Sequence, residues 1–305
     1  MKLIKPSFEI WEQPTGLEGV YKQIEKVGRV CYKSENKITE DSAKPFVDRM
    51  IKSGHGAMLE HGTVYLEFHV KDPSEVGEEE YHNQQSELNK LISRYANNKY
   101  SIIKVNHYYD TVFITTNYRV LIENNWLKDL KYICEPTEYH EKRVCVRFTT
   151  DVGVSRELNR HRVNSQAEQS TRYCNFSKDK FGNELSIMIP PEFTEEEINN
   201  IFKCRLYADD MYAHKIADWQ KLEWWVWANR CCELAYMNLI RLGWKPQQAR
   251  RILPLDLQTE LNHCAFISDW KHFFKLRDDK AAHPDMQLLA KPLHEEFIKR
   301  GYIKN

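Results

Sequence analysis

Arginine side chains concentrate in one short stretch of the chain, between positions 156 and 172. The basic residues of this stretch are Arg156, Arg160, His161, Arg162 and Arg172. A guanidinium group is a planar fork of donors that suits phosphate groups and carbonyl-bearing rings. The same stretch carries Glu168, Ser170 and Thr171, whose carboxylate and hydroxyl groups can bind sugar or phosphate oxygens. The residue types are therefore those of a nucleotide-binding site.

The same triplet, Arg160, His161 and Arg162, also fits a plainer interpretation. Runs of charged residues usually face solvent, so an arbitrary Arg-His-Arg at a helix end more often forms a solvent-exposed surface than a ligand-binding site. Three consecutive side chains at a helix end fan around its circumference and cannot share one face. They must contact several partners or lie between subunits if they bind ligands.

Composition limits the class of protein. The chain has 305 residues with 44 basic and 44 acidic side chains, so no global field attracts it to nucleic acid or to an anionic membrane. Its eight cysteines form no Cys-x-x-Cys pair and no Cys/His zinc pattern, so we expect no metal site. No apolar run approaches the ~20 residues of a transmembrane helix, and the first residues lack a secretion signal. We expect a soluble, reduced, cytoplasmic protein with no membrane partner.

The periodicity of apolar residues predicts the elements that must position the arginine stretch. Alternation predicts strands at residues 62–70, 112–115, 143–148 and 185–189. Spacings of three and four predict helices at residues 16–32, 78–96, 117–133, 153–163 and 285–300, and further helices between 246 and 277. A second helix capped by Thr39 or Asp41 runs to Gly54, and Thr194 with Glu197 forms a capping box that opens a helical region to Leu242. After Val163, a polar loop is expected.

Strands that are followed mostly by helices, without an alternating βαβ rhythm, indicate an α+β fold. We predict an antiparallel sheet with long helices, in a single domain that spans residues 1–305.

Three segments of the chain follow a recognisable order. Residues 55–61 have the pattern His-x-x-x-x-Glu-His, Arg160, His161 and Arg162 are followed by Ser170 and by Arg172 with Tyr173, and residues 249–255 have Arg277 downstream. These segments resemble the motifs of flavin-dependent thymidylate synthases, the thymidylate synthase-complementing protein family, in which the last one is the C-terminal substrate segment. The resemblance implies a homotetramer with active sites shared between subunits. Relative to compact members, residues 72–150 are an insertion, whose expected role is to enlarge the subunit or to cover part of the site.

The resemblance implies a set of cofactor residues and a set of substrate residues. Those implied for FAD are His55, Arg160, His161, Arg162, Glu168 and His272. Those implied for the nucleotide dUMP are Glu157, Arg160, Glu168, Gln169, Ser170, Thr171, Arg172, Arg250 and Arg277. Arg250 is expected to reach the nucleotide of a neighbouring subunit. Arg277 matches the arginine that polarises the uracil ring, which makes it the catalytic residue.

The activity implied is methylation of dUMP at C5 to give dTMP. Methylenetetrahydrofolate, a folate, supplies the carbon, and FAD reduced by NADPH supplies the hydride. In such enzymes the cofactor carries the difficult chemistry, while the protein orients it and tunes charge.

The chain departs from the family pattern at several positions. Phe266 and Ser268 stand where relatives carry an Asn and an Arg that contact FAD. Glu157 replaces a Gln beside the nucleotide, and its carboxylate would repel phosphate unless Arg156 or Arg160 neutralises it.

Two alternatives stay open at this point. One is a related flavin-dependent C5-methylase of another pyrimidine nucleotide, UMP or dCMP, which the departure at Glu157 keeps in play. The other is a non-enzymatic protein that binds a nucleotide or RNA through the arginine loop. The balanced charge and the lack of an extended basic stripe argue against the second alternative.

Overall fold

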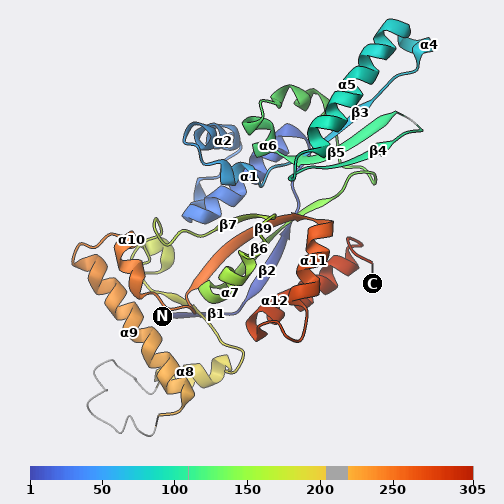
Figure 1. Cartoon of the computed structure of the whole chain (residues 1–305). Helices are drawn as coiled ribbons and strands as arrows, with labels where there is room; N and C mark the ends of the chain where they lie inside the picture. Colours follow the sequence, from blue (N-terminus) through green and yellow to red (C-terminus); the bar gives the residue numbers. More distant parts are fainter. Residues whose placement is uncertain (109, 204–218, 305) are drawn as a thin grey trace.

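A four-stranded antiparallel sheet in the order β2-β6-β9-β7 forms the centre of the protein. The computed structural model describes residues 1–108, 110–203 and 219–304. The strands of this sheet are β2 (Ser7–Trp11), β6 (Arg143–Asp151), β7 (Ser165–Glu168) and β9 (Gln258–Phe266). The two inner strands, β6 and β9, pair so that Phe148 lies opposite Leu261. Figure 1 shows β9 at the middle of this sheet, with helices on both sides.

Two smaller sheets flank the central one. A three-stranded antiparallel sheet has the order β3-β5-β4, with β3 (Thr63–His69), β4 (Ile102–Asn106) and β5 (Thr111–Asn117). The third sheet is a parallel pair of β1 (Lys2–Ile4) and β8 (Ser186–Met188).

The helices differ widely in length. The longer ones are α1 (Gly16–Tyr32), α2 (Ala43–Lys52), α5 (Glu78–Ala96), α8 (Glu195–Lys203), α9 (Lys221–Arg241), α11 (Ile267–Arg277) and α12 (Pro284–Lys299). The shorter ones are α3 (Gly56–Leu59), α4 (Pro73–Val76), α6 (Tyr118–Glu123), α7 (Val152–Leu158) and α10 (Pro246–Ala249). In the described part of the chain, no helix is both long and apolar enough to span a bilayer.

The two faces of the central sheet pack against different helices, because successive side chains of a strand point to opposite faces. Val146, Phe148 and Leu261 face a core that α7, α11 and α12 complete. Cys145 and Cys264 face the opposite core, which contains the buried side of α1. The short connection through α7 therefore lies on the same face as α11, and this places the ends of the two helices close together.

The predicted insertion, residues 72–150, runs from α4 to the end of β6. Within it, α5, β4 and β5 extend the three-stranded sheet at one end of the molecule, away from α8 and α9 in Figure 1. Its last strand, β6, is an inner strand of the central sheet. The segment thus contributes both to a peripheral layer and to the centre of the fold.

The α+β fold with antiparallel sheets is confirmed, and so are most predicted elements. α1 and α5 have the predicted bounds, and the strand predicted at residues 62–70 is β3. The Thr194–Glu197 capping box is also present, with the Thr194 amide donating to the Glu197 carboxylate at 2.7 Å. The helical region predicted to Leu242 is seen as α8 and α9, while residues 204–218 lie outside the described residues.

Several predicted elements are wrong in extent or type. The helix predicted at 117–133 is α6 followed by a turn at Asn125, which has a positive φ of 58°, and by a 3₁₀ segment. Thr39 and Asp41 do not cap α2, whose first flanking residue is Ser42. The helix predicted to Val163 ends at Leu158, and β7 replaces part of the polar loop. The largest error is β9, an inner strand that lies where helices were predicted.

Candidate active site

The end of α11 meets the end of α7, and this contact joins residues from two of the predicted motifs. Arg277, at the end of α11, donates from Nη1 to Glu157 Oε2 at 2.7 Å and from Nη2 to the Glu157 carbonyl at 2.9 Å. Its Nε donates to His161 Nε2 at 3.1 Å. Arg277 is 116 positions from His161 and 120 positions from Glu157 in sequence. The fold therefore assembles a charged cluster that we call the Arg277 cluster: Glu157, His161 and Arg277.

Local packing explains why the two helix ends meet. The Asp151 carboxylate accepts a hydrogen bond from the Val154 amide at 2.7 Å, which caps α7 directly after β6. On α11, Trp270 and Phe273 are fully buried against the sheet. These contacts fix the direction of both helices, so Arg277 reaches α7 from a rigid element.

His161 lies inside the turn that follows α7 and is 8% exposed. Burial, followed by the charges of Arg277 and His272, lowers the pKa of His161 to about 4. The imidazole is therefore neutral near pH 7, and its Nε2 lone pair can accept the hydrogen bond that Arg277 Nε donates. His161 therefore helps to hold Arg277 in place, and because it is neutral it does not repel the guanidinium.

Neither Arg156 nor Arg160, the two neighbours considered above, forms the ion pair with Glu157. Its carboxylate pairs with Arg277, whose side chain is 17% exposed. Arg156 and Arg160 are exposed side chains at the end of α7. The reason is geometric, because Glu157 points toward α11 whereas its basic neighbours in sequence project to other sides of the helix end.

Arg160 and Arg162 flank the buried His161 and are both exposed. Within residues 1–108, 110–203 and 219–304, neither forms an ion pair with the protein. As predicted, the three side chains do not share one face, because His161 points inward and Arg160 and Arg162 point outward. The two guanidinium groups are available to anionic groups of a ligand.

A second group of site residues lies at the end of β7. Glu168 accepts from the Thr259 hydroxyl at 3.0 Å and from Asn159 Nδ2 at 3.3 Å. Sequence reasoning missed Thr259 and Asn159. Thr259 belongs to β9, the strand that was not predicted, and Asn159 gave no signal beyond its place beside Arg160.

The loop after β7 carries the predicted substrate residues Gln169 to Arg172. Its backbone is fixed on both sides, since the Gln169 amide donates to the Glu260 carbonyl at 2.8 Å and the Ser170 amide to the Cys31 carbonyl at 2.9 Å. The Ser170 hydroxyl accepts from the Arg172 amide at 3.3 Å. Arg250 donates to the Thr171 hydroxyl at 3.2 Å within the same chain.

The two remaining predicted residues lie in different surroundings. His272 is an exposed residue of α11, and its ring centroid is 6.3 Å from that of His161, so it adjoins the Arg277 cluster. His55 precedes α3 and is also exposed, with its Nδ1 3.5 Å from the Tyr32 hydroxyl. Within one chain the predicted site therefore consists of the Arg277 cluster with His272, the Glu168 group, the Ser170 loop with Arg250, and His55.

Two cysteines on the inner strands depart from the expectation of reduced, unpaired thiols. Cys145 and Cys264 form a disulfide across β6 and β9. They are 119 positions apart, so their spacing gave no signal. His61 Nδ1 lies 3.0 Å from Cys264 Sγ, and the three possible ligand atoms are within 4.8 Å of one another. With both sulfurs in the disulfide, the group has no thiolate to offer a metal.

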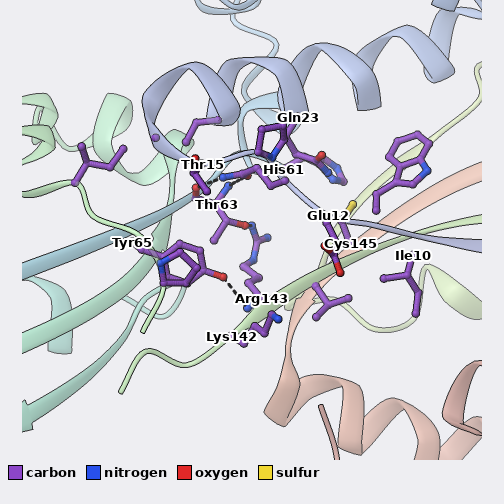
Figure 2. A pocket seen from close by; sticks show the side chains of 18 of the residues that line it. Ile10, Glu12, Thr15, Gln23, His61, Thr63, Tyr65, Lys142, Arg143 and Cys145 are labelled. Atoms are coloured by element: carbon purple, nitrogen blue, oxygen red, sulfur yellow. Dashed lines mark hydrogen bonds between the residues drawn. The ribbon is translucent and has the colours of Figure 1, made fainter. Parts of the chain in front are cut away.

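Figure 2 shows a pocket between the start of α1, β3 and β6. His61, Thr63, Tyr65 and Arg143 line it, and the Tyr65 hydroxyl accepts from the Arg143 amide at 3.2 Å. Burial lowers the pKa of His61 to about 3. No predicted site residue lines this pocket, so it is separate from the Arg277 cluster.

Comparison with known proteins gives one family match. The model of the thymidylate synthase complementing protein family matches residues 136–300. No curated protein matches the sequence.

Among solved structures, the chain is similar to a UMP/dUMP methylase, PolB, from Streptomyces cacaoi. In the form bound with 5-Br dUMP the identity is 15%, the match covers 98% of this chain and 93% of that chain, and the TM-score is 0.41. In the form bound with 5-Br UMP the identity is 14%, the coverage is 98% and 92%, and the TM-score is 0.42.

Proposed function

The chain belongs to the thymidylate synthase complementing protein family, and from this premise we propose that it methylates dUMP at C5 to give dTMP. Membership makes it a methyltransferase of the flavin-dependent thymidylate synthase type. The non-enzymatic binding protein considered above is thereby excluded. We further propose methylenetetrahydrofolate as the carbon donor, FAD as the cofactor, NADPH as its reductant and a homotetramer as the assembly.

The observation that carries the proposal is the Arg277 cluster. Arg277 is the residue that the family resemblance makes catalytic, and it lies beside Glu157 and His161 of the arginine stretch. Two motifs that lie far apart in the sequence are thus in direct contact, which supports the proposal.

Arg277 can stabilise charge on a bound uracil ring. A guanidinium group has five N–H donors. Three of them, one on each of Nη1, Nη2 and Nε, are used by Glu157 and His161. One N–H donor on each terminal nitrogen remains for a ligand. A fixed cation beside the ring stabilises negative charge as C5 becomes nucleophilic, by the electrostatic logic of an oxyanion site. Since Glu157 and His161 hold the group, it need not reorganise during the reaction.

The Ser170 loop and Arg250 are suited to the phosphate and sugar of the nucleotide. The backbone of the loop is docked to α1 and β9, so its hydroxyl groups and the exposed Arg172 have defined positions. Arg250 reaches Thr171 of its own chain. We propose that Arg172 and Arg250 provide the charge for the phosphate, while Ser170 and Thr171 donate hydrogen bonds to it. Gln169 and Glu168 complete this side of the site.

Arg160 and Arg162 fit the phosphate groups of FAD, because both are exposed and lack an anionic partner in the described residues. The buried ring of His161 fixes the turn from which they extend. We propose that His55 and His272 lie along the flavin. When bound, the flavin supplies the hydride that completes the methyl group.

The carboxylate of Glu157 is the feature that favours UMP as an alternative substrate. A carboxylate beside the nucleotide can accept a hydrogen bond from a ribose 2′-hydroxyl, which UMP has and dUMP lacks. Its pairing with Arg277 reduces this capacity, since one oxygen already accepts the guanidinium. For this reason we place dUMP first.

Turnover of dUMP, UMP and dCMP by the purified protein, with methylenetetrahydrofolate, NADPH and FAD present, tests the proposal. We expect dTMP to form from dUMP with the highest kcat/KM of the three. A clear preference for UMP or dCMP would replace the substrate while retaining the reaction, whereas no methylation of any of them would reject the reaction.

A further inference from the structure

Three side chains with metal-binding atoms meet in the core between the central sheet and α1. Cys145 of β6 and Cys264 of β9 lie opposite each other in the sheet, and His61 lies two residues before β3. The Nδ1 atom of His61 is 3.0 Å from Cys264 Sγ, and the three possible ligand atoms lie within 4.8 Å of one another. All three side chains are buried. We call this set the His61 group.

The redox state of the two cysteines decides whether the His61 group can hold a metal. In the oxidised form the two sulfurs are bonded to each other and offer no thiolate. A dithiol reductant transfers two electrons and two protons to this disulfide, which becomes two thiols while the reductant itself becomes a disulfide. A metal ion then displaces the two thiol protons, because the thiolate is the ligand.

The ligand types and their spacing favour zinc. Proteins bind Zn²⁺ through Cys and His in tetrahedral sites, with Zn–S of ~2.3 Å and Zn–N of ~2.0–2.1 Å. These lengths require the nitrogen to lie about 3.6 Å from each sulfur and the sulfurs about 3.8 Å apart. The sulfurs separate when their bond is broken, and His61 Nδ1 is already 3.0 Å from one of them. A shift of the imidazole by about 0.6 Å therefore completes the set.

Arg143 favours the thiolate form of the group. It lies two residues before Cys145 in β6, so the two side chains point to the same face of the sheet. Its guanidinium donates to the Glu60 carbonyl at 2.7 Å and to the Ser165 hydroxyl, and it forms no ion pair with the described residues. A cation beside a thiol stabilises the thiolate. Two thiolates in turn neutralise a divalent ion, so the buried site carries no net charge.

A cavity of about 180 Å³, the pocket of Figure 2, gives the group an entrance and a fourth ligand position. His61, Cys145 and Gln23 line it. The Nε2 atoms of Gln23 and His61 are buried and have no hydrogen-bond partner in the described part of the chain. Since buried polar atoms are nearly always hydrogen-bonded, these two atoms favour a polar occupant of the cavity. Zinc with three protein ligands keeps its fourth position open to such a molecule.

We propose that the reduced protein binds one Zn²⁺ per chain through His61 Nδ1 and the Sγ atoms of Cys145 and Cys264, with a water molecule from the cavity as the fourth ligand. A chain then holds either the disulfide or the metal, never both. No residue of the His61 group belongs to the Arg277 cluster, so this inference goes beyond the proposed function and does not depend on it.

The zinc content of the full-length protein in its two redox states tests the proposal. One sample keeps the disulfide, and the other is reduced with dithiothreitol and freed of the reductant under nitrogen. Thiol counts on the denatured chains verify the two states. Both samples are equilibrated with zinc chloride, desalted and analysed for bound metal. We expect one more Zn²⁺ per chain in the reduced sample, because the remaining cysteines are free thiols in both states.

Substitutions identify the ligands. Loss of a residue that only orients a ligand weakens metal binding by ~10–100-fold, so loss of a ligand should weaken it by at least about 100-fold. We expect this for Cys264→Ser and for His61→Gln in the reduced state. Cys231→Ser, which removes a free thiol of α9, is the matched control and should retain the zinc. With Co²⁺ in place of zinc, the thiolate-to-cobalt absorption of the reduced wild type should be absent in Cys264→Ser.

Two results would overturn the proposal. One is an equal zinc content of the oxidised and reduced wild type, a comparison that needs no variant to fold. The other is zinc that is retained by folded His61→Gln and Cys264→Ser but lost in Cys231→Ser, which would assign the metal to α9. Zinc is measured without flavin or nucleotide, so a failure of dUMP methylation remains distinguishable from a failure of this inference.

Discussion

Arg277 donates to the Glu157 carboxylate at 2.7 Å, and this ion pair links the end of α11 to the end of α7. The same guanidinium donates to His161 at 3.1 Å, so one residue is held by a carboxylate and a neutral imidazole. Because Glu157 and His161 belong to the arginine stretch, the pair unites two sequence motifs in one structure.

Arg277→Ala should abolish most methyl transfer while much of the flavin remains bound. Loss of one preorganised electrostatic donor lowers kcat by ~10²–10³ in comparable sites. Bound flavin is measured from its absorbance, and dTMP from product analysis of the same samples. Lys275→Ala, an exposed cation on the same helix, should behave like the wild type. If dTMP formation and NADPH oxidation instead decreased in step with flavin loss, Arg277 would be a binding residue.

Ser170→Ala should raise the KM for dUMP by roughly tenfold with a smaller loss of kcat, because a hydrogen bond to a charged phosphate is removed. The Ser170 hydroxyl also accepts from the Arg172 amide, so the loop loses a local restraint as well. Steady-state kinetics with varied dUMP measure both constants. Ser93→Ala on α5 is the matched control, and an unchanged KM in Ser170→Ala would remove this residue from the nucleotide site.

Glu157→Gln should lower kcat by roughly tenfold and leave the KM for dUMP nearly unchanged, because the carboxylate is paired with Arg277 and its loss frees the guanidinium that it holds. Steady-state kinetics with varied dUMP measure both constants. A lower KM with an unchanged kcat would instead show that the carboxylate repels the phosphate and does not position Arg277.

The folded protein should lose stability as the pH falls from about 6.5 toward 4. Burial holds the pKa of His161 at about 4 and that of His61 at about 3, and it lowers the pKa of His263 well below its usual value of 6.5. In this window the unfolded chain binds protons on these histidines and the folded chain does not, so protonation favours unfolding, on the order of 1–3 kcal/mol per histidine.

Urea unfolding at a series of pH values measures this dependence. His161→Gln, which cannot titrate, should reduce the slope between pH 6.5 and 4. His82→Gln, at an exposed position of α5, should leave it unchanged. Equal slopes for the wild type and for His161→Gln would contradict a buried neutral imidazole at position 161.

The sequence predicted the elements whose pattern is local. The helix at residues 16–32 and the strand at 62–70 have clean periodicities, and both are present as α1 and β3. β9 was missed because its two faces are both buried, and polar side chains such as Glu260 and Asn262 lie in its interior-facing positions. Its alternation of apolar and polar residues therefore did not indicate which side faces solvent, and helices were expected there.

In the site as well, residues within one motif could be predicted from the sequence, whereas contacts between distant residues could not. The arginine stretch and Arg277 could be named from motifs, but their mutual contact depends on the pairing of β6 with β9. Arg277 could not be named as the partner of Glu157, because the two residues are 120 positions apart in sequence. Thr259, which binds Glu168, could not be identified while its strand was unrecognised. The roles of the site residues and the limits of the 72–150 insertion stay predictions.

Growth rescue of a thymidine-requiring bacterium that lacks its own thymidylate synthase is the most direct test of the central claim. We predict that the wild-type gene supports growth without thymidine and that the Arg277→Ala gene does not, although both proteins accumulate with bound flavin. Failure of the wild type to rescue, while it accumulates as a yellow flavoprotein, would contradict dTMP formation as the function and would favour another pyrimidine nucleotide.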